Sequence, residues 1–239
     1  AIKIAGLAKE AGIPDGVFNV LPGFGHEVGK ALALHNDIDT LVFTGSTAIA
    51  KQLMIYAGES NMKRVWTEAG GKSPNIVFAD APDLDKAAQN AAGAFCFNQG
   101  EVCTAGSRVL VHEIIAEEMQ ERMIEIMKNI NVGDPFDESN SMGAVVSKEQ
   151  YEKIQSYIEF ANNSNDCEVL CGNEMVSDSG YFVRPMLVLS KNDHRLAQEE
   201  IFGPILSMVT FKDEAEALKI ANDTCYGLGD GLWTNDESL

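Results

Sequence analysis

Apolar residues recur along the chain in two patterns that alternate. Helical spacing of apolar positions predicts helices at residues 1–11, 27–34, 46–57, 84–97, 114–130, 148–163 and 213–222. Short apolar runs bounded by glycine, proline and polar residues predict strands at residues 17–21, 41–43, 64–67, 75–78, 107–113, 166–171, 181–189, 205–211 and 228–234. Strands that alternate with helices form βαβ units, so the chain is expected to adopt an α/β fold with a mostly parallel sheet.

A glycine pair, Gly70 and Gly71, interrupts this alternation between two predicted strands. The chain can pass there from one sheet to another, so we expect a first domain over residues 1–67 and a second over residues 68–239. We also expect both ends to be truncated, because the chain starts inside a predicted helix without an initiator methionine and stops soon after a predicted strand.

Composition restricts the partners of the protein. A hydrophobic content of 45% is enough for a buried core, and the 36 acidic against 18 basic side chains give a formal net charge of -18. Such a surface repels phosphate backbones and anionic lipid headgroups, and no apolar run approaches the length of a membrane span. We therefore expect no nucleic acid and no membrane partner.

The cysteine pattern restricts the compartment and the kind of site. The chain has five cysteines, which are spread out and include no Cys-x-x-Cys pair. An odd, dispersed set in a chain of this length favours reduced thiols over a disulfide framework, and it lacks the paired spacing of a structural zinc site. We expect a cytoplasmic protein without a metal centre.

The first candidate for chemistry is the stretch Phe43-Thr44-Gly45-Ser46, where a predicted strand ends and a predicted helix begins. A helix start directs free backbone N–H groups and the positive end of the helix dipole at its ligand, and phosphate is the natural occupant. Gly45 allows close approach to the backbone, and Ser46 can cap the helix. Taken alone, these four residues are better explained as an ordinary capped helix.

The second candidate is Glu68, which lies between Trp66 and the glycine pair where the chain must bend. Partial burial would raise the pKa of its carboxyl toward the range of a general base. Taken alone, Glu68 is better explained as a surface glutamate beside a turn.

The third candidate is Cys103, in a loop of small and polar residues at 98–108 between a predicted helix and a predicted strand. Loops held by a rigid scaffold often carry reactive groups, and a partly exposed thiolate near N–H donors attacks carbonyl carbon readily. The alternative is a buried, unreactive cysteine, which is our interpretation of Cys96 in its Ala- and Phe-rich helix. We interpret the remaining cysteines as structural: Cys167, Cys171 and Cys225.

The fourth candidate is the pair of acids Glu199 and Glu200, followed by Phe202 and a Gly-Pro turn. The carboxylates could hold the diol of a sugar while the aromatic residue flanks a flat ring. The alternative is a helix end followed by a turn.

Taken together, these stretches resemble the aldehyde dehydrogenase superfamily, in the family's order and through nearly the whole chain. The stretches around Glu68, at 98–108 and at 199–204 are each characteristic of that family. Residues 98–108 and 229–234 look most like the branch that acts on γ-glutamyl-γ-aminobutyraldehyde, with betaine-aldehyde enzymes as close neighbours.

The resemblance implies a fold and a reaction. Residues 1–67 would be the second half of a Rossmann-type NAD(P)-binding domain, and residues 68–239 a C-terminally incomplete catalytic domain. Cys103 would attack a small-molecule aldehyde to give a thiohemiacetal and then a thioester, and Glu68 would activate the water that hydrolyses the thioester. The cofactor would be NAD or NADP, and the parent protein a homodimer or homotetramer.

The resemblance also implies which residues contact the ligands. Glu200 would hold the nicotinamide ribose, and Gly45 and Ser46 would lie under the pyrophosphate. The full set of implied cofactor-binding residues is Phe43, Thr44, Gly45, Ser46, Ala69, Gly70, Glu200 and Phe202. The implied lining of the aldehyde pocket is Phe97, Val102 and Thr104.

The chain departs from the family in residues and in extent. Ala69 stands where the family has leucine, and Ala50 stands where a glycine is common. The family's Trp-Asn-x-Pro stretch, which completes the oxyanion hole, and its Lys-Pro-x-Glu stretch, which holds the adenosine ribose, lie upstream of Ala1. Loss of one oxyanion donor costs on the order of 10²–10³ in rate, so we expect the isolated chain to be a poor or inactive dehydrogenase. A scaffold without turnover and a residual thiol esterase are the alternatives.

Overall fold

The computed structural model describes residues 1–172, 174, 176, 179–236 and 238. Contacts between residues divide the chain into two compact units, Ala1–Ala69 and Gly70–Leu239. The division falls just before the first glycine of the Gly70–Gly71 pair, so Glu68 and Ala69 lie in the first unit.

The first unit is built on the parallel pair of β1 (Thr40–Thr44) and β2 (Arg64–Glu68), with Thr44 opposite Glu68. Its helices are α1 (Ile2–Glu10), α2 (Lys30–Leu34), which continues a π-helical turn at Gly25–Gly29, and α3 (Thr47–Glu59). The helix α3 is the crossover between the two strands and buries Ala50, Leu53 and Ala57. Ala50, which stands where the family resemblance implies a glycine, is nearly fully buried in α3.

The strand expected at residues 17–21 is wrong. Residues in this segment form turns, and the Val17 N–H donates to the carbonyl of Pro14 at 3.2 Å. An apolar run becomes a strand only where a neighbouring strand takes up its backbone groups, and the sheet of this unit consists of β1 and β2.

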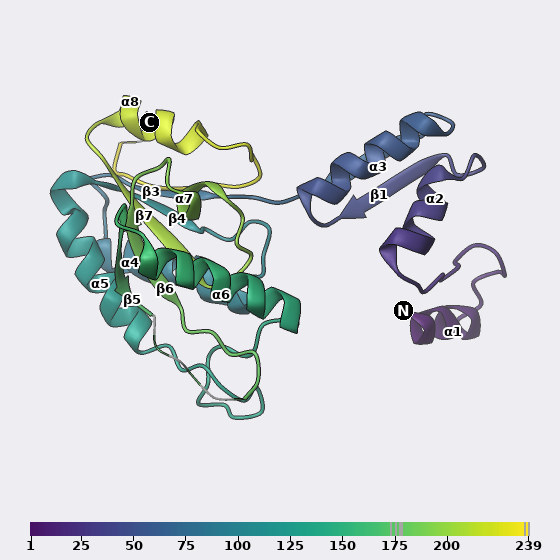
Figure 1. Ribbon diagram of the computed structural model, residues 1–239, viewed down its shortest axis with the longest axis horizontal. Helices are drawn as coiled ribbons and strands as arrows, with labels where there is room; N and C mark the ends of the chain where they lie inside the picture. Colours follow the sequence, from purple (N-terminus) through teal and green to yellow (C-terminus); the bar gives the residue numbers. More distant parts are fainter. Residues whose placement is uncertain (173, 175, 177–178, 237, 239) are drawn as a thin grey trace. The chain divides into compact units, whose positions relative to one another are not determined.

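The second unit is built on a six-stranded sheet in the order β5-β6-β7-β4-β3-β8 (Figure 1). Its strands are β3 (Pro74–Val77), β4 (Arg108–His112), β5 (Cys167–Cys171), β6 (Met186–Ser190), β7 (Ile205–Phe211) and β8 (Gly231–Trp233). All neighbours are parallel except β5, which runs antiparallel to β6. The predicted α/β fold with a mostly parallel sheet is therefore confirmed.

Two of these strands are shorter than the apolar runs that predicted them. The strand β6 starts at Met186 rather than at residue 181, because Pro185 has no N–H to contribute to a ladder. The strand β8 spans Gly231–Trp233 rather than 228–234, since Gly229 and Asp230 precede the pairing with β3.

Helices cover both faces of the six-stranded sheet (Figure 1). They are α4 (Leu84–Cys96), α5 (Ala116–Lys128), α6 (Lys148–Asn163), α7 (Arg195–Gln198) and α8 (Glu214–Asn222), with short helical turns at Phe97–Gly100 and Glu113–Ile115. Successive strand residues point to opposite faces, so Val109 and Val111 pack with α4 and α5 while Leu110 packs with α7 and α8. Each central strand is buried on both faces, which explains its continuous apolar run.

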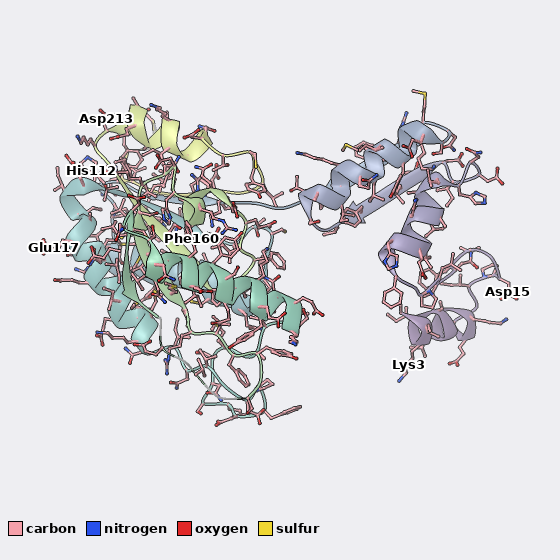
Figure 2. All side chains as sticks on the ribbon, viewed as in Figure 1. Lys3, Asp15, His112, Glu117, Phe160 and Asp213 are labelled. Atoms are coloured by element: carbon pink, nitrogen blue, oxygen red, sulfur yellow. The ribbon has the colours of Figure 1, made fainter. Side chains whose placement is uncertain are left out.

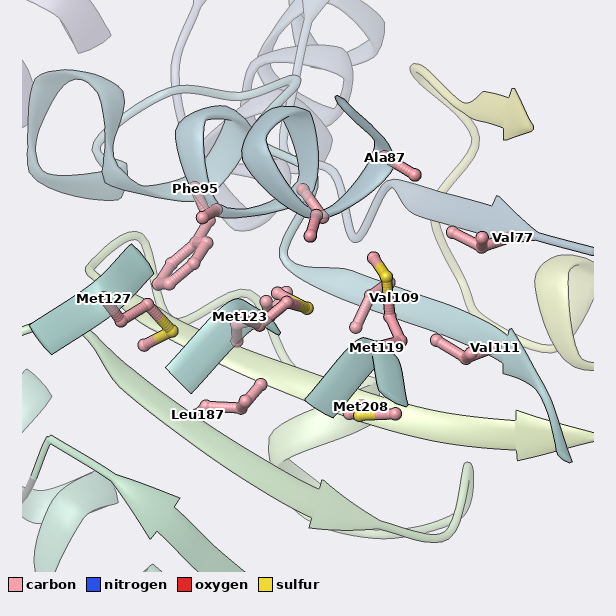
Figure 3. Close-up of a cluster of buried hydrophobic side chains, with 14 of the residues drawn as sticks. Val77, Ala87, Phe95, Val109, Val111, Met119, Met123, Met127, Leu187 and Met208 are labelled. Carbon is pink, nitrogen blue, oxygen red and sulfur yellow. The ribbon is translucent and has the colours of Figure 1, made fainter. Parts of the chain in front are cut away.

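The largest core cluster lies between α4, α5 and the sheet (Figure 3). Met119, Met123 and Met127 recur every four residues on one face of α5 and are almost fully buried. They pack with Phe95 of α4 and with strand residues that include Met208. Unbranched methionine side chains fill the irregular space between helix and sheet.

Side-chain caps define where several helices begin. Ser46, Asp83, Ser147 and Asp213 each accept the backbone N–H of the residue three positions later, at the starts of α3, α4, α6 and α8. Asp213 is marked at the start of α8 in Figure 2. Such a cap contributes about 1 kcal/mol, and the cap at Ser46 starts α3 directly after the candidate phosphate-binding glycine.

Candidate active site

The candidate residues of the second unit gather at the amino ends of its parallel strands. Gly70 and Gly71 precede β3, Cys103 precedes β4, and Glu200 precedes β7. Because β7, β4 and β3 are neighbours in the sheet, the three loops that enter them meet at one edge.

The glycine pair brings two of these loops into contact. A Cβ on Gly70 would lie 2.2 Å from Oε2 of Glu200, and a Cβ on Gly71 would lie 2.3 Å from the carbonyl oxygen of Cys103. The Gly71 N–H donates to Oε1 of Glu200 at 3.2 Å. Only glycine allows both approaches, so this pair joins the Glu200 carboxylate and the Cys103 backbone.

The loop before Cys103 has an unusual backbone. Asn98, Gln99 and Gly100 are all left-handed, with φ of 49°, 58° and 74°. A Cβ on Gly100 would lie 2.5 Å from the carbonyl oxygen of Gly203, so this turn also packs against the loop that follows Glu200. Non-glycine residues in this region cost of order 1–3 kcal/mol each and cluster at functional sites.

The cysteines differ in their surroundings. Cys103 is half-buried in its loop, and Cys225 is exposed. Cys96 lies at the end of α4, where burial raises the pKa of its thiol to about 12. A thiol with so high a pKa is a poor nucleophile, which agrees with the interpretation of Cys96 as an unreactive core cysteine.

The segment around Glu200 is held by the helix α6. Lys153 Nζ donates to the Glu200 carbonyl at 3.1 Å, and Gln150 Nε2 donates to the carbonyls of Ile201 and Phe202 at 3.0 and 2.6 Å. These bonds support Phe202 in a left-handed conformation, with φ of 58°. The sequence analysis missed Gln150 and Lys153. Their three-residue spacing on one helix face was the available signal, but it names no partner.

Lys72 adds a buried positive charge to this edge of the sheet. Its side chain is 2% exposed, and its Nζ has no hydrogen-bond partner among the described residues. Burial, assisted by the nearby charge of Arg108, lowers the pKa of Lys72 to about 7, while the carboxylates of Glu200 and Glu199 act in the opposite direction. The amino group of Lys72, which is protonated below about pH 7, is therefore part of the electrostatic environment of Glu200.

Arg108, the first residue of β4, is completely buried and ties several loops together. Its Nε donates to the carbonyl of Lys72 at 3.0 Å, and its terminal nitrogens donate to Asn192 Oδ1 and to the carbonyls of Ile220 and Ala221 at 2.8 to 3.0 Å. The guanidinium thereby connects the entry to β3 with the last turn of α8.

The three residues implied for the aldehyde pocket do not share one described cavity. Phe97 lies at the end of α4 with 73% of its surface exposed, and Val102 is half-buried. Thr104 is exposed and lines a cavity of about 280 Å³ with Trp233 and neighbouring residues, a cavity that neither Phe97 nor Val102 lines.

In the first unit, the candidate residues lie at the carboxyl ends of the strands. Phe43 and Thr44 end β1, Glu68 ends β2, and the Gly45 N–H donates to the Glu68 carbonyl at 3.0 Å. Ser46 Oγ accepts the N–H of Ile49 at 3.4 Å, so α3 begins directly above this edge.

The ends of β1 and β2 differ in how closely their side chains are packed. A Cβ on Gly45 would lie 2.4 Å from the Phe43 ring, so a larger residue there would require the ring to move. The side chain of Glu68 is exposed, so the first unit by itself does not bury this carboxylate. Ala69 follows as the last residue of this unit.

Two kinds of feature are absent from the described residues. No group of three His, Cys, Asp or Glu side chains there could hold a metal ion. In the same part of the chain, no helix has the length and apolar character needed to cross a membrane.

Known proteins resemble this chain throughout. The sequence matches the aldehyde dehydrogenase family over residues 1–239. It is 46% identical over 238 residues to the NADP/NAD-dependent aldehyde dehydrogenase PuuC of Escherichia coli, which covers 100% of this chain and 48% of that protein.

Solved structures match the fold as well. An indole-3-acetaldehyde dehydrogenase of P. syringae, solved in complex with NAD+, superposes with a TM-score of 0.95 at 56% identity, covering 99% of this chain and 48% of that one. A γ-glutamyl-γ-aminobutyraldehyde dehydrogenase of Burkholderia cenocepacia gives 0.94 at 50% identity, with the same coverage. The chain spans about half the length of the curated relatives it matches. From its family match, its relatives and its fold, the chain belongs to the aldehyde dehydrogenase family.

Proposed function

We propose that this chain carries the nucleophile and the general base of an enzyme that oxidises an aldehyde to a carboxylic acid with NAD(P)+. Family membership supports the reaction class. The observation that supports the assignment of residues is the Gly70–Gly71 pair, because the Glu200 carboxylate and the Cys103 backbone pack against these consecutive residues.

The two units would have separate roles. We assign residues 1–67 to the second half of the cofactor domain and residues 68–239 to the catalytic domain, with further parts of both contributed by a longer parent protein. Support comes from the relatives, which are about twice as long as this chain. We further propose a cytoplasmic parent that assembles as a homodimer or homotetramer, as the family resemblance implies.

The residues of both units fit an NAD(P) cofactor. The start of α3 offers backbone N–H groups behind Gly45, where Gly45 and Ser46 would lie under the pyrophosphate, and Phe43 and Thr44 would complete this part of the cofactor site. Glu200 would hold the nicotinamide ribose, since one oxygen of its carboxylate is fixed by the Gly71 N–H, and Phe202 would pack near the nicotinamide ring. We also assign Ala69 and Gly70 to cofactor binding, as the family resemblance implies. When bound, NAD(P)+ supplies the two-electron oxidant of the reaction.

The chain's own residues would begin and end the reaction. The thiolate of Cys103 adds through Sγ to the aldehyde carbon, and the backbone N–H of Cys103 donates to the oxygen of the resulting thiohemiacetal. After oxidation, the acyl group remains on Sγ as a thioester. Glu68 takes a proton from water, the resulting hydroxide adds to the thioester carbon, and the acid leaves as the C–S bond breaks.

The relatives indicate two classes of aldehyde. One relative is named for γ-glutamyl-γ-aminobutyraldehyde and another for indole-3-acetaldehyde, at 50% and 56% identity. We propose an amino-aldehyde as the substrate, because residues 98–108 and 229–234 resemble that branch, and an aryl-acetaldehyde as the second candidate.

The test is NADH or NADPH formation with a panel that contains both aldehyde classes. The 239-residue chain and its longer parent are compared with Cys103→Ser, and Cys225→Ser serves as the matched control at an exposed cysteine. We expect weak turnover by the chain, strong turnover by the parent, complete loss in Cys103→Ser and no change in Cys225→Ser. A parent that oxidises no aldehyde, or a Cys103→Ser protein that keeps its activity, would show the proposal to be wrong. Hydrolysis of an activated ester with and without NAD tests the residual esterase alternative.

A further inference from the structure

The loop before Cys103 is tied by two side chains to a segment much later in the chain. Gln99 Nε2 donates to the carbonyl of Ala144 at 3.0 Å, and the Val146 N–H donates to both carboxylate oxygens of Glu101, each at 3.1 Å. We call these two contacts the 99/101 clamp. The Gln99 side chain donates its hydrogen bond and the Glu101 side chain accepts its own, so neither residue could replace the other in the clamp.

The clamp holds a backbone that is unfavourable by itself. Asn98 and Gln99 are left-handed non-glycine residues, and Gly100 continues the left-handed turn. Local bonds close the turn, since Asn98 Nδ2 donates to the Glu101 carbonyl at 3.1 Å and the Glu101 N–H donates to the Asn98 carbonyl at 2.9 Å. Strained turns of this kind persist when their surroundings over-determine them, and the clamp provides such a restraint from outside the loop.

The other side of the clamp is a fixed part of the core. Val145, between the two clamp partners, is 3% exposed and packs in the cluster that contains Ile154 of α6. Its N–H donates to the Tyr181 carbonyl at 2.9 Å, and Ser147 caps α6 one residue after Val146. The segment 144–146 therefore cannot follow the loop, so it sets where the loop lies.

The carboxylate of Glu101 is the unusual member of the clamp. Burial raises its pKa, and the bond from the Val146 N–H counteracts part of that shift. Partial burial of a carboxylate costs free energy that a fully exposed glutamate would not lose. The hydrogen bond that Glu101 accepts from the Val146 N–H offsets that cost and explains the position of Glu101.

We propose that Gln99 and Glu101 are positioning residues for Cys103, which fix the nucleophile loop by clamping the left-handed turn to residues 144–146. The inference rests on the proposed role of Cys103 as the nucleophile. It is independent of turnover, because the position of a thiol can be measured without cofactor or aldehyde.

The test is the rate at which iodoacetamide labels Cys103 in the 239-residue chain, read by peptide mass. Cys225, which is exposed, is the internal control for reagent, and Cys96, which is largely buried, reports unfolding. The variants are Gln99→Leu, Glu101→Leu and Glu101→Gln, with Glu121→Leu on the exposed face of α5 as the matched control.

We expect loss of either clamp bond to free the loop and raise Cys103 labelling. The rise should be about tenfold in Glu101→Leu, because a charge-assisted bond is lost, and roughly threefold or more in Gln99→Leu. Glu101→Gln should restore slow labelling to within about twofold of the unmodified 239-residue chain, since its amide oxygen still accepts the Val146 N–H. The labelling rates of Cys225 and Cys96 should not change in any variant. In Glu121→Leu, Cys103 should be labelled at the rate of the unmodified 239-residue chain.

Unchanged Cys103 labelling in both leucine variants would overturn the inference, as would a Glu101→Gln chain that labels as fast as Glu101→Leu. If Glu101→Leu also raises Cys96 labelling, that variant has partly unfolded, and Gln99→Leu becomes the deciding variant. A rise in Gln99→Leu that is confined to Cys103 supports the positioning role. A parallel rise at Cys96 in Gln99→Leu contradicts it. If the labelling pattern is as expected but the longer parent protein oxidises no aldehyde, the proposed function is rejected and the clamp is retained. Aldehyde oxidation with unchanged labelling would reject the clamp alone.

Discussion

Replacing Arg108 with methionine should destabilise the second unit more than any surface charge does. The side chain is fully buried, and its guanidinium donates to three carbonyls and to Asn192 Oδ1. Methionine has a similar length but no donor. The change therefore leaves the carbonyls of Lys72, Ile220 and Ala221 without this partner inside the protein.

The magnitude follows from two opposing effects. A hydrogen bond from a charged group stabilises by about 1.5–3 kcal/mol, and an unsatisfied buried acceptor costs about 1–3 kcal/mol. Releasing the guanidinium from burial offsets part of the loss, and burial does lower the pKa of Arg108 to about 10. Breaking a comparable buried charged network costs roughly 3–5 kcal/mol. For a unit of this size, each kcal/mol lowers Tm by about 2–4 °C, so we expect a drop of about 6–20 °C.

The assay is urea and thermal unfolding followed by circular dichroism. Arg122→Met is the matched control, because Arg122 of α5 makes ion pairs with Asp85 of α4 and with Glu118 of α5. Exposed ion pairs contribute little to stability, so the control should lose much less stability than Arg108→Met. If Arg108→Met loses no more stability than Arg122→Met, the reasoning from buried carbonyls is refuted.

Two further predictions concern the glycine pair and the buried lysine. Gly71→Ala places a Cβ 2.3 Å from the Cys103 carbonyl oxygen and should destabilise the chain by about 1–3 kcal/mol. Gly93→Ala in α4 meets nothing within 4 Å and should stabilise the chain by about 0.5–1 kcal/mol. Equal Tm values for the two variants would contradict the close contact between Gly71 and the Cys103 carbonyl. Because the pKa of Lys72 is about 7 in the folded chain and 10.5 unperturbed, the unfolded chain binds more protons between those values, and the free energy of unfolding should rise with pH across that window. Urea titrations at pH 7 and pH 10 should show this rise clearly reduced in Lys72→Met, and an identical rise in both proteins would count against a lowered pKa of Lys72 in the folded chain.

Much of the fold could be predicted because its signals are local. Helices α3, α4, α6 and α8 begin within a residue of their predicted starts, since each has a Ser or Asp cap before an amphipathic run. The doubly covered strands β4 and β7 were found as continuous apolar runs. The strand expected at residues 17–21 failed because an apolar run contains no information about whether a neighbouring strand exists to pair with it.

The candidate residues were found by motif, but their arrangement was not. Cys103, Glu68 and Glu200 stand in stretches whose composition and order resemble one family. Their chemistry taken singly was ambiguous, since a loop cysteine and a surface glutamate are common. Gln150 and Lys153 were missed, because a polar residue on an amphipathic helix gives no sign of whether it faces water or a distant carbonyl.

The sequence by itself determined the alternation of strands and helices, the capped helix starts and the family, because each depends on residues near one another in the chain or on a motif. Tertiary structure decided which loops meet. Gly71 contacts Cys103, Gly70 contacts Glu200, and Glu101 is bonded to Val146, across separations that no local spacing encodes. The physical reason is that the order of strands in the sheet, set by long-range packing of the core, brings the amino ends of β3, β4 and β7 together.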